Sequence, residues 1–100
     1  MAKGYLVGEL TVTNPEGYQK YASQVPATIA AYGGRYLVRG GAAAPLEGGG
    51  NIGRMVVLEF DSPEKLMTWY NSPEYQAILP HRLNNSTGRV MCVTGYEPPV

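Results

Sequence analysis

Hydrophobic and polar positions alternate near the beginning of the chain, and this alternation predicts a strand over residues 4–12. The positions on one face are Leu6, Gly8, Leu10 and Val12, and those on the other are Tyr5, Val7, Glu9 and Thr11. Successive side chains of a strand point to opposite faces of a sheet, so the more apolar first set is expected to face the core.

Apolar positions then recur at spacings of three and four, which predicts a helix that begins at Pro15. Asn14 is the expected N-cap, because a proline at the first helical position has no N–H that needs a partner. The apolar stripe consists of Tyr18, Tyr21, Ala22, Val25, Ile29 and Tyr32. Because the stripe continues beyond Pro26, we expect this proline to kink the helix rather than end it, and the following Gly33 and Gly34 to end it.

Two apolar runs on either side of a long loop, RYLVR at 35–39 and RMVVLEF at 54–60, predict an antiparallel pair of strands. With Tyr36 opposite Leu58 and Val38 opposite Val56, one face of the pair is almost entirely apolar. The other face then pairs Arg35 with Glu59, Leu37 with Val57 and Arg39 with Met55.

The stretch WYNSPEY at 69–75 raises the question of whether it binds a ligand or marks the start of a new helix. Its Ser72-Pro73-Glu74 repeats Ser62-Pro63-Glu64, and each triplet is typical of an N-cap, a first-position proline and a first-turn acid. We therefore expect one helix from residue 63 and another from residue 73. The second has an apolar stripe of Tyr75, Ile78, Leu79 and Leu83, is bent by Pro80, and precedes a last strand over 89–96.

The order of these elements predicts a single α+β domain over residues 1–100 with a ferredoxin-like βαββαβ topology. Its four-stranded antiparallel sheet has helices on one face only. The uncovered face carries Tyr5, Val7, Glu9, Thr11, Arg35, Leu37, Arg39, Met55, Val57 and Glu59. This face is too apolar for water and too charged for a dry core, so we expect a second copy of the chain to cover it as a homodimer.

Composition excludes several classes of partner and site. Eight Lys and Arg balance eight Asp and Glu, so the chain lacks the excess of basic residues that binds a phosphate backbone, and we expect no nucleic acid partner. Cys92 is the only cysteine and His81 the only histidine, so we expect no internal disulfide, no metal site and no bound cofactor. No run is apolar enough for a signal peptide or a membrane span, which predicts a cytoplasmic protein that does not bind membranes.

Three blocks of sequence together resemble one family. They are TNPEGYQKYASQVPATIAAYGGRYLVRGG, RMVVLEFDS and WYNSPEYQAILPHR, within a likeness that runs from about Gly4 to Tyr96. The resemblance is to the domain-of-unknown-function family numbered 1330, short bacterial proteins of the dimeric α+β barrel superfamily. It implies the fold and the dimer described above, and the family has no agreed activity. The wider superfamily includes cofactor-free monooxygenases, muconolactone-type isomerases and haem enzymes, so the fold does not choose among them.

Glu59 and Arg39 are the principal candidates for catalysis. A carboxylate next to Val57 under a second subunit would lose water, which would raise its pKa toward the range of a general base. Arg39 would then stabilise a developing enolate or carboxylate. The structural alternative is an ion pair between Glu59 and Arg35 across the strands, which would keep the carboxylate ionised and do no chemistry.

The remaining candidates are less specific. His81 has an ordinary pKa suited to proton transfer, although a surface position beside Arg82 would explain it equally well. The candidates for ligand binding are Tyr5, Glu9, Arg35 and Tyr36. Residues 48–53 match G-x-G-x-x-G, but a dinucleotide-binding loop must follow a strand and open a helix, whereas this one opens a strand. We interpret residues 42–53 as a glycine-rich loop that is able to cover a cavity.

These observations leave two classes of function open. The first is a cofactor-free enzyme that acts on a small carbonyl or aromatic compound by proton transfer or oxidation. The second is a homodimer that binds such a compound without turnover, or that has a purely structural role with its cavity filled by side chains.

Overall fold

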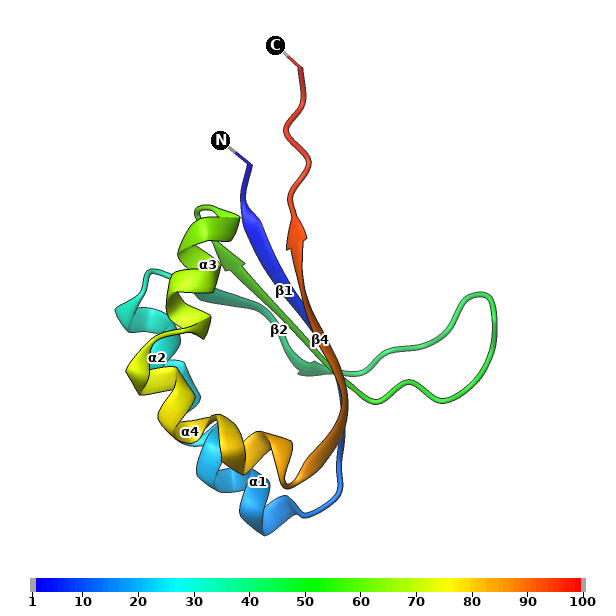
Figure 1. Ribbon diagram of the computed structural model, residues 1–100. Coiled ribbons are helices and arrows are strands. Elements are labelled where there is room, and N and C mark those ends of the chain that lie inside the picture. Colours follow the sequence, from blue (N-terminus) through cyan, green and yellow to red (C-terminus); the bar gives the residue numbers. More distant parts are fainter. Residues whose placement is uncertain (1, 100) are drawn as a thin grey trace.

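The computed structural model describes residues 2–99 and shows the predicted α+β fold. The elements in chain order are β1 (Gly4–Val12), α1 (Pro15–Ala22), α2 (Val25–Ala31), β2 (Arg35–Gly41), β3 (Arg54–Phe60), α3 (Pro63–Tyr70), α4 (Pro73–Leu83) and β4 (Ser86–Thr94). The strands form one antiparallel sheet in the order β2-β3-β1-β4, and the helices all lie against one of its faces (Figure 1). This arrangement confirms the ferredoxin-like prediction.

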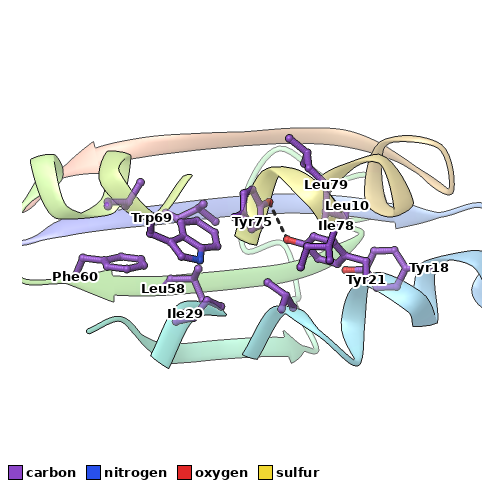
Figure 2. Packing of buried hydrophobic residues seen from close by; sticks show 13 residues of the cluster. Leu10, Tyr18, Tyr21, Ile29, Leu58, Phe60, Trp69, Tyr75, Ile78 and Leu79 are labelled. Atoms are coloured by element: carbon purple, nitrogen blue, oxygen red, sulfur yellow. Dashed lines mark hydrogen bonds between the residues drawn. The ribbon is translucent and has the colours of Figure 1, made fainter. Parts of the chain in front are cut away.

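The core lies between the sheet and the helices, as the alternation in β1 predicts. Leu6 of β1 pairs with Leu58 of β3, and both are buried on the side of the helices. Large rings fill the space above this part of the sheet, with Trp69 between Phe60 and Tyr75 (Figure 2). The sheet thus has a covered inner face and an open outer face.

The stretch at 69–75 marks the end of one helix and the beginning of the next. Ser62 Oγ accepts a hydrogen bond from Lys65 N at 3.1 Å, and Ser72 Oγ accepts one from Tyr75 N at 3.2 Å. Ser72 Oγ also donates to the carbonyl of Trp69 at 2.7 Å, which ties the end of α3 to the start of α4. The predicted N-caps at both positions are confirmed.

The prediction of one kinked helix through Pro26 was wrong. α1 ends at Ala22, where Ser23 N and Gln24 N bond to the carbonyls of Gln19 and Tyr21, and α2 begins at Val25. Pro26 lies in the first turn of the new helix. In the first turn an N–H has no partner within the helix, so a proline there starts a helix without the loss of a bond.

The predicted inner stripe of α4 was wrong at its last position. Leu83 is 58% exposed, whereas Arg82 is only 6% exposed and shares the buried face with Tyr75, Ile78 and Leu79. Residues seven apart lie near the same face of a helix, so Arg82 follows from Tyr75 by helix geometry. The last strand was also placed too late, since β4 begins at Ser86 and ends at Thr94.

The predicted register of β2 and β3 holds only at its beginning. Arg35 lies opposite Glu59 and Tyr36 opposite Leu58, but the register then shifts. Val38 pairs with Val57 and Arg39 with Val56, so Arg39 lies on the inner face with Val56 instead of opposite Met55 on the outer face. The cause is a bulge, which adds one residue to β2 and reverses the alternation that follows it.

Gly40 follows Arg39 at the second irregularity of β2 and has a φ of +68°. A side chain there would be strained, and its Cβ would collide with Nη1 of Arg54. Gly40 therefore allows the turn of the strand and leaves room for the Arg54 guanidinium.

We expect Ser72→Ala to lower the free energy of unfolding by about 1–2 kcal/mol, because a buried hydroxyl loses both its cap bond and its bond to Trp69. Asn14→Ala is the matched control, since Asn14 is also followed by a proline but its side chain makes no cap hydrogen bond. Denaturant unfolding monitored by circular dichroism measures both variants. Equal losses in the two variants would contradict the assignment.

Candidate functional site

Glu59, Tyr5 and Arg35 meet on the outer face of the sheet. Oε1 of Glu59 lies 2.6 Å from Nε of Arg35, and Oε2 accepts a hydrogen bond from the Tyr5 hydroxyl at 3.0 Å. The hydrogen bond from Tyr5 and that from Arg35 lower the pKa of the Glu59 carboxyl below its ordinary value. The chain by itself therefore shifts this pKa in the direction opposite to that expected of a general base.

The structure does not bring the three catalytic candidates together. Arg39 lies on the inner face, across the sheet from Glu59, and its guanidinium stacks 4.8 Å from the ring centre of Tyr36. His81 is half-buried near the end of α4, where its carbonyl accepts a hydrogen bond from Asn85 Nδ2 at 2.7 Å. Glu9 is an exposed residue whose carboxylate accepts a hydrogen bond from Gly53 N at 3.4 Å.

A cavity lies between the inner face of the sheet and the helices, and it includes two of the candidates, Tyr36 and Arg39. The sheet provides Leu6, Gly8, Leu10, Tyr36, Arg39, Arg54, Val56, Leu58 and Val90, and the helices provide Tyr18, Tyr21, Ala22, Val25, Ile29, Tyr75 and Arg82. The volume of the cavity, measured as the space open to the centre of a water molecule, is about 40 Å³. The space therefore holds a few water molecules, and a larger compound requires side chains to move.

A surface groove adjoins this cavity beside α1. It is lined by Val12, Pro15, Tyr18, Gln19, Ala22, Ser23, Pro26, Arg39 and Arg54. Tyr18, Ala22, Arg39 and Arg54 belong to both the groove and the cavity, so these side chains separate the inner space from the surface. A ligand that enters by this route passes the two arginines.

Each arginine of the cavity faces a tyrosine ring. The Cζ atom of Arg39 is 4.8 Å from the ring centre of Tyr36, that of Arg54 is 5.9 Å from Tyr18, and that of Arg82 is 5.8 Å from Tyr21. Aromatic faces attract guanidinium groups and orient them, but they do not neutralise the charge. The cavity is therefore cationic.

Tyr21 and Tyr75 add hydroxyl groups to the same cavity. Their oxygens are 2.9 Å apart in a buried hydrogen bond between α1 and α4 (Figure 2). Burial is the main cause that raises the pKa of both phenols, so both remain protonated at neutral pH. Their mutual bond uses one of two hydroxyl protons, and the other is available to a ligand.

Sequence reasoning missed Arg54, Arg82 and the Tyr21–Tyr75 pair. Arg54 lies an even number of residues before Val56, Leu58 and Phe60 in β3, so its side chain projects from the same inner face of the sheet. Arg82 lies seven residues after Tyr75, on the buried face of α4. A charged residue within an apolar stripe was the signal in both cases.

Other kinds of site receive no support from the described chain. Within residues 2–99, no group of three or more His, Cys, Asp or Glu side chains is arranged to hold a metal ion. None of the helices in the same range has the length and apolarity to cross a membrane. The loop at 42–53 connects β2 to β3, opens no helix and does not line the cavity.

We expect Glu59→Gln to destabilise the protein at neutral pH, because the amide cannot form the ion pair with Arg35. The lowered pKa of Glu59 means that its contribution is present above its ordinary pKa of 4.5 and is lost as the pH falls through the lower folded-state value. The difference in stability between the two proteins should therefore narrow in acid. Thermal unfolding between pH 3 and pH 7, in steps of about one unit, measures it, with Glu47→Gln in the exposed loop as control. A difference that stays constant over this range would contradict the ion pair.

Comparisons with known proteins agree with this architecture. The RPA0582 protein of unknown function from Rhodopseudomonas palustris has a TM-score of 0.77 at 14% identity, over 97% of this chain and 85% of that one. The same protein in methylated form gives 0.74 at 15% identity, over 97% and 83%.

SnoaB, a cofactor-independent oxygenase from Streptomyces nogalater, has a TM-score of 0.64 at 12% identity, over 98% of this chain and 97% of that one. At these identities the likeness shows a shared fold. No curated protein matches the sequence. The family described as "Domain of unknown function (DUF1330)" matches residues 3–96, and the chain therefore belongs to this family.

Proposed function

We propose that the protein is an enzyme without a bound cofactor that acts on a small carbonyl or aromatic compound in the cavity between the sheet and the helices. The observation that carries this proposal is the composition of the cavity wall. Apolar side chains from β1, β3 and α2 form most of its wall, and the same wall includes Arg39, Arg54, Arg82 and the hydrogen-bonded pair of Tyr21 and Tyr75. Apolar walls with a few convergent polar groups are typical of small-molecule sites.

The donors fit a reaction that passes through an anion. Transfer of a proton from a carbonyl or phenolic compound to a water molecule in the cavity leaves negative charge on an oxygen of the compound, and this anion is the species that molecular oxygen would oxidise without a cofactor. Fixed donors in a site that excludes water stabilise such an oxygen more than water does. The Tyr21–Tyr75 pair and Arg82 are buried and held by their neighbours, so they need little rearrangement.

SnoaB offers support of a weaker kind. It is described as a cofactor-independent oxygenase and has the same fold. A shared fold carries many reactions, so this likeness favours the proposed reaction class only by analogy.

A second candidate function is binding without turnover, and one observation favours it. No carboxylate or histidine of residues 2–99 lines the cavity, so no side chain of the wall is an evident proton acceptor. Glu59 is on the outer face and engaged with Arg35. A compound held by the arginines would then be sequestered, and measurement of turnover separates the two functions.

We also propose that two copies pair through the outer face of the sheet. Its exposed apolar side chains include Leu37 and Met91, which are 51% and 42% exposed, and Val7 and Val57 lie between them on the central strands. A monomeric protein seldom leaves such a face uncovered. Sheet-to-sheet packing about a two-fold axis covers it, as the dimeric α+β barrel fold implies.

The loop at 42–53 adds to the case for a partner. It leaves the sheet on the side away from the helices (Figure 1). Near its tip Leu46 is 96% exposed. A second copy on the outer face would lie within reach of this loop and provide apolar surface for Leu46.

We expect Ala22→Leu to weaken binding of cavity ligands at least about tenfold, because the larger side chain occupies space shared by the cavity and the groove. Ala77→Leu, at an exposed position of α4, is the matched control. A library of small carbonyl and aromatic compounds, screened by thermal shift and confirmed by calorimetry, identifies the ligand. Oxygen uptake and product analysis without added metal or cofactor then measure turnover. Ligands that bind both variants equally would contradict the cavity as the site.

We expect light scattering to give about twice the chain mass of 10.8 kDa for the wild type. Val57→Glu should shift the protein to the monomer, since it places a charge at the centre of the outer face. Ala27→Glu, on the exposed side of α2, should leave the dimer intact. A wild-type mass of one chain would contradict the interface.

A further inference from the structure

The cavity holds positive charge that the protein does not balance. The whole chain has equal numbers of acidic and basic residues, eight of each, so the excess is local. Arg39, Arg54 and Arg82 line the cavity, and none of them forms an ion pair with a carboxylate of residues 2–99. Acidic groups on the outer face pair with Arg35, Lys3 and Lys65 instead.

Two donors of these arginines are buried and unpaired. Nε of Arg54 and Nε of Arg82 have no hydrogen-bond partner, and Arg82 as a whole is 94% buried, the complement of its 6% exposure. A charged donor without a partner in the interior opposes folding. Tyrosine faces orient the guanidiniums but accept no strong hydrogen bond from Nε. These donors are therefore arranged for an acceptor that the chain does not supply.

The shape of the donors selects among acceptors. The Nε–H and one Nη–H of a guanidinium form a planar fork that matches the two oxygens of a carboxylate. The rest of the wall is apolar, with Gly8, Val56 and Ile29 among its members. A ligand with one planar anionic end and a compact apolar body matches both parts of the wall, and side chains of the wall move to admit it, because the closed cavity holds only a few water molecules.

We propose that the cavity recognises the carboxylate of a small aromatic or aliphatic acid, with Arg82 and Arg54 as its principal ligands and Arg39 at the entrance. This inference rests on the proposed small-molecule function and names the chemical class of the compound. The Tyr21–Tyr75 pair donates the remaining hydroxyl proton to the same ligand. The acid enters past Arg39 and Arg54, which belong to both the groove and the cavity.

The test compares benzoate with benzamide, its neutral counterpart of nearly equal shape, by calorimetry on the intact protein at neutral pH. We expect benzoate to bind and benzamide to bind at least tenfold more weakly, a difference of about 1.4 kcal/mol. Inorganic phosphate is the third probe, and it should bind more weakly than benzoate because its hydrated tetrahedral shape does not fit the apolar walls.

Three variants test the residues. Arg82→Met should weaken benzoate binding about 30-fold or more, since the carboxylate loses a buried charged partner. Without ligand, the Arg82→Met protein should have a melting temperature equal to or above that of the wild type, because an apolar side chain replaces a buried charge that has no ion-pair partner. Arg54→Met gives a second measurement should Arg82→Met fold poorly, and Arg89→Met, on an exposed part of β4, is the control.

The outcomes separate this inference from the proposed function. Equal binding of benzamide and benzoate, or binding of phosphate as tight as that of benzoate, would overturn carboxylate recognition and leave a small-molecule cavity in place. Unchanged benzoate binding in both Arg82→Met and Arg54→Met would also overturn it. If neither benzoate nor any compound of the library binds, the proposed function fails together with the inference.

Discussion

The packing of Trp69 holds together the layer of helices on which the rest of the structure depends. Its ring lies 5.4 Å from that of Phe60 in β3 and 4.1 Å from that of Tyr75 in α4, and its Nε1 donates to Thr28 Oγ1 of α2 at 3.0 Å. One side chain thus connects a strand with three helices. Tyr75 extends the contact to Tyr21 of α1, so the position of the cavity follows from the position of this ring.

Charged side chains have different neighbours on the two faces of the sheet. On the outer face Glu59 and Asp61 form ion pairs with Arg35 and Lys3 within the chain. On the inner face each of the three arginines lies over a tyrosine ring, Arg82 also interacts with the Tyr75 hydroxyl, and none of them pairs with a carboxylate of residues 2–99. A buried arginine such as Arg82 contributes less to stability than an apolar residue of similar size when it has no ion-pair partner.

The parts of the fold that were predictable are those that local chemistry determines. Ser72 and Pro73 favour a helix start by their own side-chain chemistry, and the alternation in β1 predicts a strand without reference to other segments. The failures occurred where the outcome depends on distant contacts. Pro26 is compatible with a kink or a new helix, and the bulge that moves Arg39 to the inner face depends on how β2 pairs with β3.

The bulge in β2 has a consequence for how the strand distributes its charges. Arg35 and Arg39 are four residues apart, so in a regular strand both would project from the same face of the sheet. One additional residue between them sends the second guanidinium through to the opposite side. A single strand thereby places one arginine on the outer face, where it pairs with Glu59, and another on the inner face, where it stacks on Tyr36.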